Sequence, residues 1–182
     1  MPAERLSPAR LAIAAWGALG FGGVLARAII GLTPMALEPI REHSLSGVQI
    51  AVYVVWVAWM WWSEGYRAFQ KLLAPRVAAR AMHLARHPRV HHVILAPLFC
   101  MSLFYATRRR LITAWLVVAM IVALVVSVRF VPQPWRGIVD GGVVVGLAWG
   151  LGAILVCFAL ALAGRPVPAD PDLPEGAPGT GS

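Results

Sequence analysis

Long apolar runs separated by short polar segments dominate the chain. The apolar runs cover residues 11–32, 45–62, 111–130 and 138–163. A helix needs about 20 mostly apolar residues to cross a bilayer. The pattern therefore predicts an all-α integral membrane protein, a four-helix transmembrane bundle that forms a single domain over residues 1–163.

A long polar segment, residues 63–92, follows the second apolar run. Tryptophans crowd the end of that run, and Trp favours the headgroup level of a bilayer. We therefore expect the chain to leave the membrane near Ser63. Pro75 can occupy the first turn of a new helix, and the segment after it predicts a cytoplasmic basic amphipathic helix that lies on an anionic membrane surface. One face of this helix carries Arg76, Arg80, His83 and His87, and the opposite face carries Val77, Ala81, Leu84 and Ala85.

Residues 93–107 are apolar but short, and they contain Pro97. As a helix they would span roughly 22 Å, against about 30 Å for the hydrocarbon core. Arg108, Arg109 and Arg110 follow at once, and carrying them across the membrane would violate the positive-inside bias. We favour a re-entrant or interfacial segment, which gives four spans. The alternative is five spans, with the C-terminus on the other side.

Proline and glycine set two further boundaries. We expect the first helix to end at Thr33–Pro34, because proline interrupts helical hydrogen bonding. Residues 164–182 combine Pro, Gly and acidic residues with few apolar ones. This composition predicts a disordered acidic tail.

Small residues recur every fourth position in the first and last spans. They are Ala14, Ala18, Gly22 and Ala26 in the first, and Gly142, Gly146 and Gly150 in the last. Such a face lets another helix approach closely, so both spans are predicted to pack through it.

The net charge of +8 is concentrated between the apolar runs. Lys71 is the only lysine, and the Arg-, Ala- and Gly-rich composition suggests a bacterial protein from a GC-rich genome. The orientation bias then predicts a multi-pass protein of the bacterial cytoplasmic (inner) membrane with a cytoplasmic N-terminus. No nucleic-acid-binding module is present, so we expect anionic headgroups, and either a second copy or another membrane protein, as partners. The residues expected to bind this surface or partner are Arg67, Lys71, Arg76, Arg80, Arg86, Arg89, Arg108, Arg109 and Arg110.

Arg27 interrupts the first predicted span, and Asp140 interrupts the last. An ionisable residue inside a span is costly and usually faces a partner or water. In the four-span arrangement both lie toward the outer ends of their helices, so we predict that they form an ion pair. Snorkelling of each to the headgroups and a role in ion movement are the alternatives.

Four histidines follow the second span: His83, His87, His91 and His92. Histidines at i and i+4 can ligate a transition metal or a haem. No Cys or carboxylate stands beside them and the neighbouring arginines repel a cation, so we expect no metal and no cofactor here.

No catalytic motif is recognisable, so the function class rests on the membrane pattern alone. We expect a non-catalytic membrane scaffold or interaction protein. The alternative is a small transporter or channel that uses Arg27 and Asp140, and a weaker one is a His-dependent metal or haem protein of the membrane.

Overall fold

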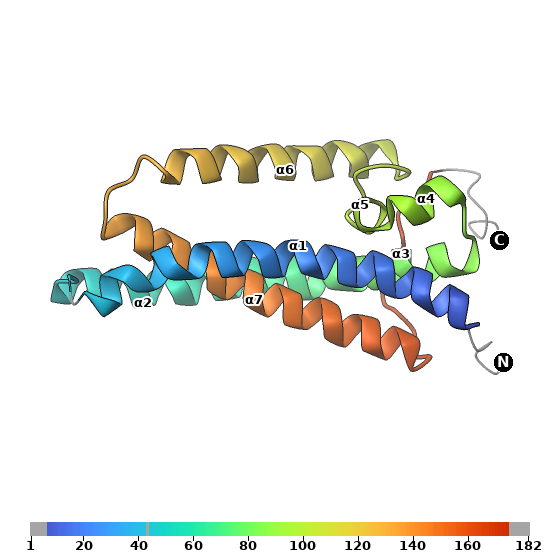
Figure 1. Cartoon of the computed structure of the whole chain (residues 1–182), viewed down its shortest axis with the longest axis horizontal. Helices are drawn as coiled ribbons and strands as arrows, with labels where there is room; N and C mark the ends of the chain where they lie inside the picture. Colours follow the sequence, from blue (N-terminus) through green and yellow to red (C-terminus); the bar gives the residue numbers. More distant parts are fainter. Residues whose placement is uncertain (1–6, 43, 175–182) are drawn as a thin grey trace.

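The computed structural model describes residues 7–42 and 44–174, and within them the chain is all-helical, without a β-strand. Three helices are long and apolar enough to cross a membrane: α1 (Pro8–Arg41), α6 (Arg108–Val128) and α7 (Trp135–Leu162). The prediction of an all-α membrane protein is confirmed at this level. Figure 1 shows these helices side by side along the long axis of the molecule.

Helix α1 does not end at Thr33–Pro34, so that prediction was wrong. It continues through Pro34 and Pro39 to Arg41. Pro39 has no N–H to donate to the carbonyl of Met35, and the side chain of Gln133 donates to that carbonyl instead, at 3.5 Å. The Pro39 ring also packs on Gly137 at the start of α7. Contacts with a distant segment thus compensate for the bond that proline removes.

The second helix is far longer than its apolar run. A capping box of Ser46 and Gln49 starts α2 (Gly47–Met60), which passes without a break into the π-helix η1 (Trp61–Leu73) and then into α3 (Ala74–Arg86). The helix therefore does not end near Trp62, as the sequence had predicted, but continues through Ser63. The N–H of Ala74 donates to the carbonyl of Phe69, five residues back, so the wide π-helical turn leads directly into Pro75.

The buried core joins α1, α3, α7 and the short helix α5 (Ala96–Cys100). Ala14 and Ala18 of α1 are almost fully buried, as are Val77 of α3, Phe99 of α5 and Ile154 of α7. Helix α6 contributes little to this core, because Ala114 is its only buried residue. In Figure 1 α6 accordingly stands apart from α1 and α7 and is attached through its two ends.

Helix directions alternate along the chain. α1 and α6 run from the end that holds α3 toward the opposite end, and α2 and α7 return (Figure 1). We name the first end the basic end and define it as α3, α4 (Val90–Ile94), α5, residues 101–110 and residues 165–174. The other end, called the far end, holds residue 42, residues 44–46 and residues 129–134.

The ambiguous segment 93–107 folds back at the basic end. It contains most of α4, all of α5 and an irregular stretch before α6. A Cβ on Gly20 of α1 would stand 2.5 Å from Cγ of Pro97, and one on Gly17 would stand 2.8 Å from Sγ of Cys100. Glycines in α1 therefore let this segment pack directly on the helix backbone.

The first part of the predicted disordered tail is docked on the protein. Leu173 is only 6% exposed, and the N–H of Thr107 donates to the carbonyl of Asp172 at 3.0 Å. The expectation of disorder is therefore wrong for the residues leading to Pro174, and residues 175–182 lie outside the described part of the chain. The composition of the tail does not predict this docking, because the docking depends on tertiary contacts with the basic end.

Candidate functional site

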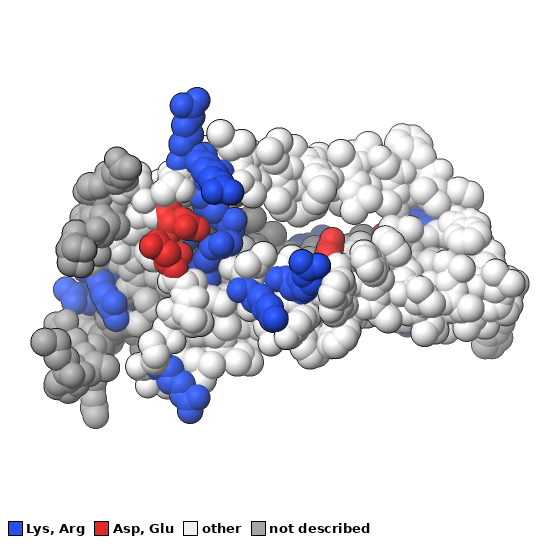
Figure 2. Space-filling view, turned by 180° about the vertical axis from the view of Figure 1, so that it is seen from behind, with Lys and Arg blue, Asp and Glu red and all other residues white. Residues whose placement is uncertain are grey.

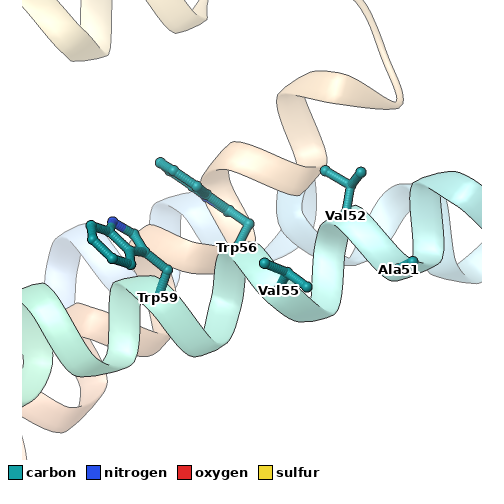
Figure 3. Close-up of a pocket in the computed structure, with 5 residues that line it drawn as sticks. All are labelled: Ala51, Val52, Val55, Trp56 and Trp59. Atoms are coloured by element: carbon teal, nitrogen blue, oxygen red, sulfur yellow. The ribbon is translucent and has the colours of Figure 1, made fainter.

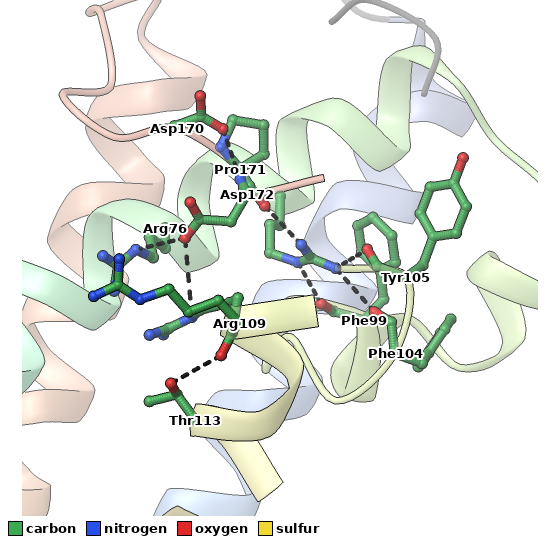
Figure 4. A network of polar contacts seen from close by, with 11 residues as sticks. Arg76, Phe99, Phe104, Tyr105, Arg109, Thr113, Asp170, Pro171 and Asp172 are labelled. Carbon is green, nitrogen blue, oxygen red and sulfur yellow. Dashed lines mark hydrogen bonds and ion pairs between the residues drawn. The ribbon is translucent and has the colours of Figure 1, made fainter. Parts of the chain in front are cut away.

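Arg80 is the central side chain of the basic end. Helical spacing places it beside Val77 and Ala81, and like them it is fully buried. It donates four hydrogen bonds, all to backbone carbonyls (Figure 4). Nε donates to Phe99 at 2.6 Å, Nη1 to Pro171 at 2.6 Å, and Nη2 to Phe104 at 3.1 Å and to Tyr105 at 2.9 Å.

These four bonds explain why a guanidinium is buried here. The carbonyls of Phe104, Tyr105 and Pro171 accept no backbone N–H among the described residues, and buried carbonyls need a donor. The guanidinium also lies over the ring of Phe99, 4.2 Å from its centroid. Burial lowers the pKa of Arg80 to about 10, which leaves the group charged at neutral pH. The sequence pattern had placed Arg80 on an exposed cationic face, and the structure corrects this.

Asp172 lies between two arginines from different helices. Its Oδ2 is 3.1 Å from Nε of Arg76 in α3 and 3.9 Å from Nε of Arg110 in α6. The Nε of Arg110 is buried and makes no hydrogen bond, so the carboxylate of Asp172 lies closer to Arg76 than to Arg110 and leaves the Nε of Arg110 without a hydrogen-bond partner. Figure 4 shows the carboxylate beside Arg76, and the tail residues Asp170 and Pro171 next to it.

The remaining cations of the predicted set are exposed. On the face seen in Figure 2, Lys and Arg gather over one half of the molecule, with acidic residues beside them. Because Asp172 and the carbonyls occupy Arg76, Arg80 and Arg110, the other cations are the ones available to external anions. The exposed members are Arg67, Lys71, Arg86, Arg89, Arg108 and Arg109.

The four histidines form two ring pairs. The rings of His83 and His87 are 4.8 Å apart, and those of His91 and His92 are 4.3 Å apart. Burial, then His87 and Arg80, lowers the pKa of His83 to about 4, and burial followed by His91 lowers that of His92. Within the part of the chain that the structure describes, no three metal-ligating side chains come together.

Arg27 and Asp140 are not brought together as an ion pair within the described residues. Oδ2 of Asp140 instead lies 3.7 Å from Nε of Arg136, one turn earlier in α7. Arg27 is exposed, and its guanidinium lies along its own helix near Gly31. The prediction compared charges inside the predicted spans. Arg136 lies in the connection just before the last span, so it was not included.

The glycine face of α7 packs closely on α2 and η1, as predicted for close helix contact. A Cβ on Gly142 would stand 2.5 Å from Nε1 of Trp56, and the position at Gly150 is filled by the ring of Phe69. At Gly146, between them, the neighbour is Glu64. The helix bearing Glu64 thus lies directly on α7, where the sequence had predicted a cytoplasmic segment.

The π-helical register sets how the cations of η1 lie. Arg67 covers the ring of Trp62 at 5.0 Å, and Lys71 covers that of Tyr66 at 4.7 Å. Both pairs are five residues apart, the spacing that a π-helix brings onto one line. A long π-helix is rare, and π-helical turns are frequent at functional sites, so η1 is the second candidate site.

An open apolar groove runs along α2. Ala51, Val52, Val55, Trp56 and Trp59 line it, and Figure 3 shows these side chains from that one helix. Of the two tryptophans, Trp56 donates to the carbonyl of Val139 at 3.3 Å.

Comparisons with protein-family models, with curated proteins and with solved structures find no match to this chain. Function is therefore argued from the residues alone.

Proposed function

We propose that the protein is a four-span protein of the bacterial cytoplasmic membrane. The crossings are α1, the α2–η1 run, α6 and α7. The alternating helix directions support this count (Figure 1). So does the start of α6 at the basic end, where Asp172 lies near both Arg76 and Arg110.

The basic end faces the cytoplasm in this proposal, so α1 begins and α7 ends on the cytoplasmic side. Connections on the far side are short, at residues 42–46 and 129–134. Clusters of arginine beside spans are retained on the cytoplasmic side. The exposed Arg86, Arg89 and Arg108 at this end support that orientation.

The function we propose is non-catalytic: the basic end binds anionic lipid headgroups and organises them around the bundle. The observation that carries it is the set of exposed cations at the basic end, which no acidic side chain neutralises among the described residues: Arg86, Arg89, Arg108 and Arg109. Each Lys or Arg near an anionic leaflet contributes about 1 kcal/mol of binding free energy. The open apolar groove of α2 supplies a surface for the attached acyl chains.

Lipid titration of the purified protein tests this function. In neutral detergent, phosphatidylglycerol is expected to raise the melting temperature more than phosphatidylcholine does. Arg108→Gln with Arg109→Gln removes two exposed charges of the basic end, which should weaken phosphatidylglycerol binding by about 2 kcal/mol, or about 30-fold. The matched control is Arg41→Gln with Arg129→Gln, which removes two exposed arginines near the far end.

Equal weakening by both double variants would overturn the proposal, because binding would then depend on net charge alone. A shift with phosphatidylcholine as large as that with phosphatidylglycerol would also overturn it. Co-purification of a stoichiometric protein partner that is lost in the Arg108→Gln, Arg109→Gln variant would instead assign the surface to protein binding.

A small transporter or channel is the second candidate, and Asp140 is the observation that favours it. Its side chain is only 6% exposed in α7, and the nearest cation, Arg136, is 3.7 Å away. Charges inside spans often mark transport paths. Solute flux into proteoliposomes, compared between the native protein and Asp140→Asn, tests this candidate. Flux that Asp140→Asn leaves unchanged removes it.

A further inference from the structure

Glu64 lies against the middle of α7. A Cβ on Gly146 would stand 3.4 Å from Cβ of Glu64 and 3.4 Å from its Oε2. Gly146 comes eleven residues after Trp135 and sixteen before Leu162, which is about 16 and 24 Å along the helix. A hydrocarbon core of about 30 Å, centred on α7, contains this point. In the four-span arrangement proposed above, the carboxyl of Glu64 therefore lies at membrane depth.

The two cations of η1 do not form an ion pair with Glu64. Arg67 covers Trp62 and Lys71 covers Tyr66, so both are turned onto aromatic rings. Within the described residues Glu64 forms neither an ion pair nor a side-chain hydrogen bond.

The helices packed against η1 bring no other charge to Glu64. On α7 the charged residues are Arg136 and Asp140, which pair with one another. Helix α2 carries no charged residue. The nearest arginine of α3 in the sequence, Arg76, is 3.1 Å from Asp172.

The site around the carboxyl is built, with close packing on both sides. Gly65 meets the side chain of Trp149, whose Cβ would lie 3.1 Å and whose ring atoms Cγ and Cδ1 would lie 3.2 Å from an added Cβ. Nε1 of Trp149 donates to the side chain of Gln70 at 2.8 Å, and its ring meets Trp61 edge-on at 5.3 Å. These contacts hold η1 on α7 and fix the position of Glu64 over Gly146.

We propose that Glu64 is an intramembrane proton-binding site whose carboxyl group holds a proton at neutral pH. An ionised carboxylate in hydrocarbon is costly unless a cation or several donors compensate it, and none does here. Glu64 is only half-buried by the protein, so a lipid-soluble reagent can reach its carboxyl. This inference goes beyond lipid binding, and it rests on the proposed membrane crossing of η1.

Carbodiimide labelling of the protein in phospholipid vesicles tests the inference. A protonated carboxyl adds across one C=N bond of dicyclohexylcarbodiimide, and the acyl group then moves from oxygen to nitrogen, giving a stable N-acylurea with no leaving group. We expect this adduct at Glu64 near neutral pH, mapped by peptide mass spectrometry, with at least tenfold less labelling at strongly alkaline pH. Glu64→Gln should abolish it. Asp140→Asn, which removes the buried carboxyl of α7, should leave it unchanged.

A water-soluble carbodiimide with an added amine separates the possible failures. It should modify exposed carboxyls such as Glu42 but not Glu64. Modification of Glu64 by the water-soluble reagent would mean that η1 lies in water, and it would overturn both the membrane crossing and the proton site. Absence of a Glu64 adduct with either reagent would overturn the proton site alone. Mapping on the native protein keeps the test valid even if Glu64→Gln does not fold.

Discussion

Arg80 and Phe99 are joined twice: Nε of Arg80 donates to the Phe99 carbonyl at 2.6 Å, and the guanidinium covers the Phe99 ring at 4.2 Å. They are nineteen residues apart in the sequence. The same guanidinium reaches the tail at Pro171. A single side chain of α3 therefore fixes the turn-back segment and the C-terminal tail in one arrangement.

Arg80→Met should destabilise the protein by about 3–5 kcal/mol, because it leaves buried carbonyls without a donor. Arg80→Lys keeps the charge but lacks the planar fork that reaches four carbonyls, so it should recover only a minor part of this loss. The measurement is the melting temperature in detergent.

Arg86, on the same helix but exposed, provides the control for Arg80. Arg86→Met should change the free energy of unfolding by no more than about 0.5 kcal/mol, so the melting temperature should change little. Similar losses at the two positions would contradict the role assigned to Arg80.

Gly150 and Gly152 lie two residues apart on different faces of α7. The site of a Cβ at Gly150 is filled by the ring of Phe69, whereas nothing lies within 4 Å at Gly152. Gly150→Ala should therefore cost about 1–3 kcal/mol through overpacking. Gly152→Ala should be neutral or slightly stabilising, because alanine is the better helix former. Equal effects on the melting temperature would mean that α7 and η1 do not pack as described.

Patterns that repeat along one helix predicted this fold well. They did not predict the features that depend on single tertiary contacts. The apolar runs located α1, α6 and α7, and the glycine spacing identified the packing face of α7. Nothing in the local pattern revealed that α2 continues beyond Ser63, because that continuity depends on packing between η1 and α7. Arg80 follows the spacing of an exposed face, and only the free carbonyls of a distant segment explain its burial.

Asp172→Asn should release the tail from the basic end. The substitution removes the anion between Arg76 and Arg110, which at this partly exposed site should cost about 1 kcal/mol. Hydrogen exchange should speed up at the Thr107 amide, which donates to the Asp172 carbonyl. High salt should have the same effect on the native protein and little further effect on the variant. Unchanged exchange at Thr107 would show that the carbonyl contacts alone hold the tail.

The stability of the basic end should fall on mild acidification. The pKa of His83 is about 4 in the folded protein, below the ordinary value of about 6.5. As the pH drops through this interval, the unfolded chain binds a proton that the folded one does not, so stability is lost from about pH 6.5 downward. Burial lowers the pKa of His83 most, and the charges of His87, Arg80, His92 and Arg86 lower it further.

Melting temperatures at about pH 7.5, 6.5 and 5 test this titration against the reference value for histidine. His83→Gln should flatten the pH dependence, whereas His91→Gln, at an exposed position, should preserve it. His92 has a lowered pKa and the same sign of effect, so some dependence will remain in His83→Gln. A native pH dependence retained in full by that variant would contradict the role of His83.

The side of the membrane on which residues 129–134 lie decides between four spans and five. Both counts place this connection between α6 and α7, but they put it on opposite sides. With the N-terminus in the cytoplasm, four spans expose Gln133 outside, and five spans expose it inside. We therefore expect a membrane-impermeant maleimide to label Gln133→Cys in intact cells, in a background with Cys100 and Cys157 replaced by Ala. A cysteine at Arg89, in the connection between α3 and α4, should be labelled only after the cells are opened. Labelling of neither site in intact cells, with both labelled after the cells are opened, would show that residues 93–107 cross the membrane, and it would overturn the shared basic end on which the lipid-binding proposal depends.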